Sequence, residues 1–260
     1  MNYLLAILAG VLQGLTEFLP ISSTGHLIIF ENIFRISQKD FGLAFDASLH
    51  LGTLLAVLIF FWKDYLQILR SKNQLLFKLA IGTAPAVFFG LLFESQIDSS
   101  LRQIWIVGVA LILFSAVFIL AEKLGKQTRF KDHTTLLDAL IIGVFQSIAL
   151  IPGVSRSGST ISAGLFLNLK REEAAKFAFM LSGPVIFGAG AKKFFEVVST
   201  STLRGSDLNF FLIGMATSAI FGYLTIKYFL KYLSTRTLYP FVFYRVAIGL
   251  ILLVFSFLSQ

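Results

Sequence analysis

Cysteine is absent from the 260-residue chain, which excludes disulfides, thiolate metal sites and cysteine nucleophiles. Charged residues are also scarce: 14% of the residues are Asp, Glu, Lys or Arg, whereas 56% are hydrophobic. A soluble domain of this length could not bury so much apolar side-chain surface. The composition therefore indicates a protein that crosses a membrane several times.

The amino-terminal run 1–20 lacks the basic n-region and the small-residue cleavage site of a signal peptide, so we expect it in the mature chain. Further along, apolar segments recur at lengths that approach the roughly 20 residues needed to span a bilayer as a helix. They predict six crossings, at 43–62, 79–93, 103–121, 177–198, 208–226 and 238–258.

The net charge of +8 is concentrated in four connections between these segments. The connections hold 14 of the 22 Lys and Arg residues and cover 63–78, 122–134, 170–176 and 227–237. Cytoplasmic loops of membrane proteins are enriched in Lys and Arg, and placing these four loops inside gives a consistent path for six crossings. Membrane topology therefore accounts for the charge, and we expect no nucleic-acid partner.

The chain contains an internal repeat with an offset of 133 residues. "GVLQGLTEFLPISSTG" (10–25) matches "GVFQSIALIPGVSRSG" (143–158), and "IGTAPAVFFGL" (81–91) matches "IGMATSAIFGY" (213–223) at nearly the same offset. The charge rule makes 79–93 run outward and 211–226 run inward, so the two halves are inverted. We expect one integral membrane domain, 1–260, with halves near 1–131 and 132–260.

Residues 1–42 and 135–169 contain too many Gly and Pro residues for simple crossings. Two re-entrant helical hairpins, one entering from each face with meeting polar tips, are the economical solution. Irregular backbone at that depth must be buried in protein or line a wet cavity. Inverted repeats of this kind place a site at their interface near the midplane.

The second tip, "PGVSRSGST" (152–160), suits a phosphate or diphosphate. Arg156 offers a guanidinium fork among hydroxyls and accessible backbone N–H groups. Broken helices add N-terminal dipoles that favour anions. The candidate substrate-binding residues at the two tips are Gln13, Ser22, Thr24, Ser155, Ser157, Gly158 and Thr160.

The first tip adds candidate catalytic residues: Glu17, Ser23 and His26, which act together with Arg156. A carboxylate beside a diphosphate indicates an intervening cation, Mg²⁺ or Ca²⁺, with Glu17 as its ligand. A cationic clamp, a metal ion, hydroxyls and a titratable imidazole together suit phosphoryl transfer. Ser23, His26 or a water molecule oriented by Glu17 or His26 are alternative nucleophiles.

Other polar residues have structural interpretations. Glu17 could pair with Arg156 in a resting state. Asp46 and His50, four residues apart, could be a metal pair, although support of the site is the favoured interpretation. "SRSGST" is not a Walker A loop, because the Gly-Lys-Ser/Thr of that motif is absent.

Together with "QGLTE", the motifs "EFLPISSTGH" and "PGVSRSGST" resemble the two signature regions of the bacterial undecaprenyl-diphosphate phosphatases of the bacitracin-resistance type. The continuation "REEAAKFAFMLSGPVIFGA" (171–189) also fits, so the resemblance covers essentially the whole chain. Gln13 departs from members that carry Glu there, which weakens a two-carboxylate metal site.

The resemblance implies a multi-pass enzyme of the bacterial plasma (inner) membrane that removes the terminal phosphate from undecaprenyl diphosphate. It also implies a required divalent cation, a site open to the external face and recycling of the lipid carrier for peptidoglycan and other wall polymers. Bacitracin would compete for the substrate. The oligomeric state is left open, with a homodimer as one alternative.

Two functions of other classes are weighed against the enzyme. Inverted repeats with broken helices are also typical of a transporter or flippase. A purely structural membrane scaffold poorly explains Arg156 between serines in an apolar region.

Overall fold

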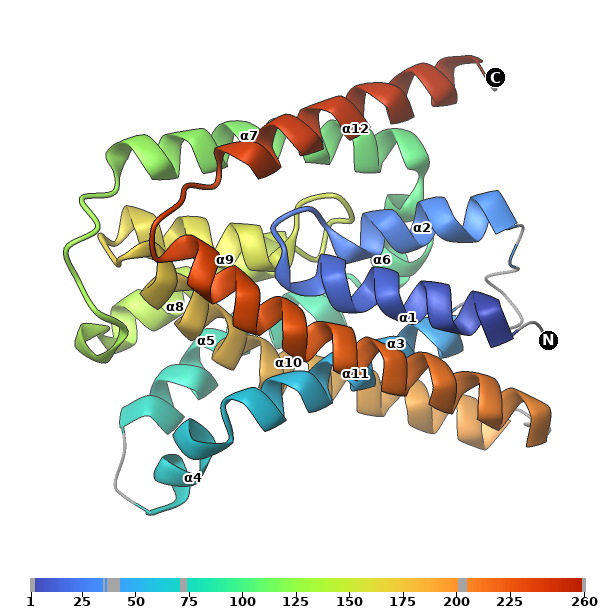
Figure 1. The fold of residues 1–260 in the computed structure, drawn as a ribbon, viewed down its shortest axis with the longest axis horizontal. Helices are drawn as coiled ribbons and strands as arrows, with labels where there is room; N and C mark the ends of the chain where they lie inside the picture. The colour runs from blue at the N-terminus through green and yellow to red at the C-terminus, as the bar shows by residue number, and fades with distance from the viewer. Residues whose placement is uncertain (1–2, 35, 37–42, 71–73, 201–204, 259–260) are drawn as a thin grey trace.

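The computed structural model describes residues 3–34, 36, 43–70, 74–200 and 205–258, and its regular secondary structure there is helical. Figure 1 shows the arrangement. The first half contains α1 (Tyr3–Phe18), α2 (Ser23–Phe34), α3 (Leu43–Phe60), α4 (Trp62–Arg70), α5 (Gln74–Leu92), α6 (Glu94–Asp98), the 3₁₀ turn η2 (Ser100–Arg102) and α7 (Ile104–Leu124). The second contains the 3₁₀ turn η3 (Lys131–His133), α8 (Leu136–Ile148), α9 (Arg156–Phe166), α10 (Arg171–Thr200), α11 (Gly205–Leu233) and α12 (Tyr239–Leu258).

Within the described residues, five helices are long and apolar enough to cross a membrane: α5, α7, α10, α11 and α12. The sixth predicted crossing corresponds to α3, whose described apolar part, Phe45–Phe60, is shorter. Large apolar side chains point outward from these helices, including Phe88, Phe243 and Phe257, which are 62%, 74% and 80% exposed. Such a surface fits a lipid environment, and the all-helical, polytopic membrane fold predicted from the sequence is confirmed.

Several helix ends differ from the predicted segment bounds. The predicted crossing 43–62 ends at Phe60, and the short amphipathic helix α4 follows. Conversely, α5 includes Lys78, α10 includes Lys176, and α11 extends past Lys227 to Leu233. Long cationic side chains can continue a helix because their apolar stems lie along it while the charge reaches water.

The order of elements repeats along the chain. The hairpin α1–α2 is followed by α3, α5 and α7, and the hairpin α8–α9 is followed by α10, α11 and α12. The two hairpins enter from opposite ends of the molecule, and their turns face each other near its centre (Figure 1). Contacts between the turns support this arrangement, since Gly153 N–H donates to Ser22 Oγ at 3.1 Å. The predicted pair of re-entrant hairpins is therefore present.

Each hairpin packs against a long helix of the other half. On α1, a Cβ at Gly10 would collide with the carbonyl oxygen of Gly214 on α11. On α8, a Cβ at Gly143 would collide with that of Gly82 on α5. Small residues allow such close backbone approach between membrane helices. The two sequence matches of the repeat therefore mark the two sides of these helix contacts.

An aromatic core holds the first hairpin in place. Phe18, at the end of α1, is 1% exposed and packs edge-to-face on Phe179 of α10, with ring centroids 5.2 Å apart. Phe179 also contacts Phe229 of α11. Offset and edge-to-face aromatic pairs stabilise a packed core beyond their area burial. This cluster fixes the end of α1 that carries Glu17.

We predict that Gly143→Ala destabilises the fold by about 1–3 kcal/mol, the usual effect of overpacking a tight core. The measurement is the thermal melting temperature of purified protein in detergent. Gly188→Ala is the matched control, because a Cβ at Gly188 meets nothing within 4 Å. Equal melting of Gly143→Ala and the control would contradict the close α8–α5 contact.

The charge rule also predicts the membrane orientation, and single cysteines can report it because the chain has none of its own. Ser99 and Thr128 are exposed and lie in connections predicted to face opposite sides. In intact cells, we expect an impermeant maleimide to label Ser99→Cys, and Thr128→Cys only after permeabilisation. The reverse pattern would overturn this orientation.

Candidate active site

Equivalent serines shape the two hairpin turns. Ser22 and Ser155 both have positive φ, 73° and 75°, a region that residues other than glycine rarely adopt. Each begins a helix: Ser22 Oγ accepts from Gly25 N–H and Ser155 Oγ accepts from Gly158 N–H, both at 3.3 Å. These hydroxyls therefore act as helix caps, a contact that the sequence analysis did not anticipate for two predicted substrate-binding residues.

A buried arginine joins the two turns. The Arg245 guanidinium, on α12, is fully buried and donates to Pro20 O at 3.3 Å and Gly153 O at 3.0 Å. Ser157 Oγ adds a bond to Leu19 O at 2.9 Å. The sequence analysis gave Arg245 no role. The signal available for it was an arginine within the apolar run 238–258, since a charge at that depth is costly and needs partners.

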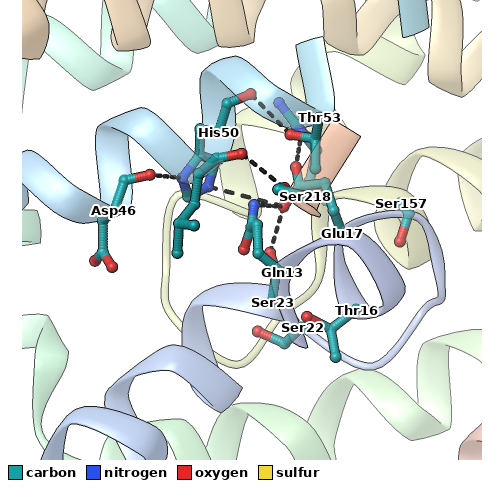
Figure 2. A network of polar contacts seen from close by, with 12 residues as sticks. Gln13, Thr16, Glu17, Ser22, Ser23, Asp46, His50, Thr53, Ser157 and Ser218 are labelled. Carbon is teal, nitrogen blue, oxygen red and sulfur yellow. Dashed lines mark hydrogen bonds and ion pairs between the residues drawn. The ribbon is translucent and has the colours of Figure 1, made fainter. Parts of the chain in front are cut away.

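Glu17 lies at the centre of a polar network that includes Gln13, Ser23 and His50 (Figure 2). Its side chain is 3% exposed, and its Oε1 is paired with Arg156 from the opposite hairpin. Its Oε2 accepts from Ser23 Oγ at 2.5 Å and from Gln13 Nε2 at 2.9 Å. A buried carboxylate is costly unless it is paired and hydrogen-bonded, and both conditions are met here.

His26, the predicted catalytic imidazole, has partners at both ring nitrogens. Its Nδ1 lies 2.7 Å from the Ser22 carbonyl oxygen, which can only accept, so the proton of the neutral ring is on Nδ1. Its Nε2 lies 2.7 Å from the Tyr244 hydroxyl and accepts from it. The two rings also stack, with centroids 5.7 Å apart. His26 therefore connects the first tip to α12.

A second imidazole, His50 of α3, faces the carboxylate. Its Nδ1 lies 2.8 Å from the Asp46 carbonyl oxygen, so by the same reasoning Nδ1 carries the proton. Its Nε2 is 3.7 Å from Glu17 Oε2. The Asp46 side chain, by contrast, pairs with Arg102 at 3.1 Å. The two residues therefore support different parts of the site.

A cavity of about 270 Å³ opens between the tips. Six of the predicted site residues line it: Glu17, Ser22, Ser23, Thr24, Ser155 and Arg156. Asp46, His50, Arg102 and Gln146 also contribute to the lining. Pockets that bury whole drug-sized ligands measure roughly 300–1,000 Å³, so this cavity suits a smaller polar group.

The remaining predicted residues of the second tip have structural contacts. Ser157 bonds to the first turn, as described above. A Cβ at Gly158 would collide with the Phe118 ring, so this position requires glycine. Thr160 Oγ1 donates to Arg156 O at 2.7 Å within α9. These three residues hold the tip in shape beneath the cavity lining.

The oxygen donors at the first tip fit a hard divalent cation that shares ligands with a phosphate. In the described part of the chain, no three His, Asp or Glu side chains gather as a metal cluster. There, Gln13 Oε1 is buried without a hydrogen-bond partner, although Gln13 is bonded to Glu17. Amide and carboxylate oxygens are the ligand types that Mg²⁺ and Ca²⁺ take, so Gln13 and Glu17 are the residues there that could hold such a cation.

Comparisons with known proteins identify the family of the chain. The model of the family described as "Bacitracin resistance protein BacA" matches residues 6–251. An "Undecaprenyl-diphosphatase" of Thermodesulfovibrio yellowstonii is 43% identical over 252 residues, 97% of this chain and 96% of the relative. Proteins with the same name from Mycobacterium ulcerans and Geotalea daltonii are 41% and 39% identical, covering 98% of this chain and 96% and 98% of those relatives. The chain therefore belongs to the BacA family.

Proposed function

We propose that this chain is a polyprenyl-diphosphate phosphatase that hydrolyses undecaprenyl diphosphate to undecaprenyl phosphate and inorganic phosphate. The observation that carries the proposal is the Glu17 carboxylate, held between the Ser23 hydroxyl and the Arg156 guanidinium of the opposite hairpin, at a cavity. The name shared by the relatives supports the lipid substrate.

In the resting site, Arg156 and Glu17 neutralise each other. A diphosphate carries several negative charges and would compete for the guanidinium, which binds phosphate through parallel N–H donors. Transfer of Arg156 to the phosphate would free Glu17 as a proton acceptor. The ion pair therefore keeps both groups charged and positioned until the substrate arrives.

Ser23 is the nucleophile that this geometry favours. Its oxygen attacks the terminal phosphorus, the bond from that phosphorus to the bridging oxygen breaks, and undecaprenyl phosphate leaves. The hydroxyl proton passes to Glu17 Oε2, which lies 2.5 Å away. Water then hydrolyses the phosphoserine, which releases inorganic phosphate and restores the hydroxyl. His50 Nε2, 3.7 Å from the same Glu17 oxygen, is the next acceptor for the proton.

Two alternatives use other nucleophiles. Attack by His26 requires its Nε2 to leave the Tyr244 hydroxyl. Direct attack by water oriented by Glu17 produces no covalent intermediate. A divalent cation, when bound, would be held by Glu17 and Gln13 Oε1 and would neutralise charge on the phosphate oxygens.

The proposed reaction also has a cellular role. Undecaprenyl phosphate would be recycled as the carrier for peptidoglycan and other wall polymers, and bacitracin would compete with the enzyme for the diphosphate. The site would open to the external face of the plasma membrane. The resemblance implies this placement, and the charge rule supports it by putting the four basic loops on the cytoplasmic side.

A flippase is the second candidate, because two hairpins entering from opposite ends are also a transporter arrangement (Figure 1). A flippase needs the anion site but no phosphorus chemistry. Phosphate release from purified protein separates the two functions.

We predict that Glu17→Ala and Arg156→Ala each lower phosphate release from undecaprenyl diphosphate in detergent by on the order of 10²–10⁴-fold. The loss follows from removing the proton acceptor or the phosphate clamp. Thermal melting of each variant checks folding, and a chelator should abolish wild-type activity until Mg²⁺ or Ca²⁺ is restored. Well-folded wild type that releases no phosphate from any polyprenyl diphosphate would refute the enzyme.

The covalent intermediate can be trapped. With substrate labelled in its terminal phosphate and a rapid acid quench, we expect label on wild-type protein and His26→Ala, and none on Ser23→Ala. Ser162→Ala is the matched control, since this buried hydroxyl of α9 has no hydrogen-bond partner among the described residues. Label lost in His26→Ala but kept in Ser23→Ala would identify His26 as the nucleophile instead.

A further inference from the structure

A second arginine reaches the same cavity from the connection between α6 and α7. Arg102 ends the turn η2 and lines the cavity together with Glu17 and Arg156. It also lines a neighbouring hollow with Gln103 and Trp105. Arg102 therefore lines both the cavity and this neighbouring hollow. The sequence analysis placed it in a connection and gave it no role.

Two carboxylates hold Arg102 through one nitrogen. Its Nη2 donates to Asp46 Oδ2 of α3 at 3.1 Å and to Glu31 Oε2 of α2 at 3.4 Å. Both acids are buried, 8% and 4% exposed. This pairing fixes the guanidinium on the cavity wall, and it involves Nη2 alone of the three guanidinium nitrogens within the described chain.

The Nε–H group of Arg102 is an unused hydrogen-bond donor. This atom is buried, and it has no hydrogen-bond partner among the described residues. A buried donor without an acceptor is costly, and arginine offers five donors in a rigid fork. An anion that enters the cavity would satisfy this donor and add a charge-assisted bond.

The proposed substrate needs such a second cation. A diphosphate has two phosphate groups, whereas Arg156 can clamp one of them and is shared with Glu17. The charged cavity-lining residues are two acids, Glu17 and Asp46, and two arginines, Arg102 and Arg156. Among the described residues that line the cavity, Arg102 is thus the second arginine side chain, available to the phosphate that Arg156 does not hold.

We propose that Arg102 is a second phosphate-binding residue, which recognises the two-phosphate head group by binding the phosphate that Arg156 does not clamp. The proposal rests on the proposed function and deepens it. It makes the cavity selective for a diphosphate over a monophosphate, because a single phosphate can be held by Arg156 alone. Undecaprenyl phosphate, which has one phosphate group, would accordingly bind more weakly than the diphosphate substrate and dissociate more readily.

The test compares inorganic pyrophosphate with inorganic phosphate as ligands of the purified protein in detergent, measured by calorimetry without turnover of lipid. We expect wild type to bind pyrophosphate more tightly than phosphate. Arg102→Gln should weaken pyrophosphate binding about tenfold, as expected for one lost charge-assisted contact. Phosphate binding should change less than about twofold, and Arg102→Lys should retain part of the preference.

Arg129→Gln is the matched control, because it also removes an arginine from an ion pair, that with Asp138, but lies outside the cavity lining. We expect it to keep the preference for pyrophosphate. Unchanged pyrophosphate binding in well-folded Arg102→Gln would overturn the proposal. An equal loss of both ligands, or the same loss in Arg129→Gln, would also overturn it, since Arg102 would then act through the fold.

Lipid hydrolysis by the same preparations separates this proposal from the proposed function. In one outcome, wild type hydrolyses undecaprenyl diphosphate and Arg102→Gln binds pyrophosphate as tightly as wild type. This outcome would refute only the role of Arg102 and would leave the phosphatase standing. Arg102-dependent pyrophosphate binding in wild type that hydrolyses no lipid would support the role of Arg102 and refute the phosphatase.

Discussion

The carbonyl groups of both hairpin turns converge on one buried guanidinium, that of Arg245. Non-helical backbone among membrane helices is stable only where its polar groups find partners inside the protein. Pro20 and Gly153 meet this condition through the same side chain, and Gly153 N–H binds Ser22 Oγ of the other turn. The two turns thus stabilise each other, and their meeting creates the cavity.

The repeat is symmetric in backbone and asymmetric in chemistry. Ser22 and Ser155, 133 residues apart, share a positive φ and a capping role. At the next position the halves diverge: Ser23 supplies a hydroxyl to Glu17, whereas its counterpart Arg156 supplies the cation. The position equivalent to Glu17 is Leu150. One tip therefore provides the acid and hydroxyl, and the other provides the guanidinium.

Sequence reasoning found the parts that depend on local pattern. Glycine spacing, charge bias and the offset of 133 residues predicted the two hairpins, and the residue types predicted the cluster around Glu17 and Arg156. Contacts between elements that are far apart in the sequence could not be predicted from it. Arg245 and Arg102 join the site only because α12 and η2 pack beside it. The capping role of Ser22 and Ser155 was hidden too, since serine carries no signal for positive φ.

The central claim is that the two tips act as one site, and a double-mutant cycle on Glu17→Gln and Arg156→Gln tests it most directly. Phosphate release from undecaprenyl diphosphate is measured for wild type, each single variant and the double variant. Groups that act as a unit have strongly non-additive effects. We predict that the double variant is about as slow as the slower single variant. Losses that multiply would show that the two residues act independently, which would contradict a single site.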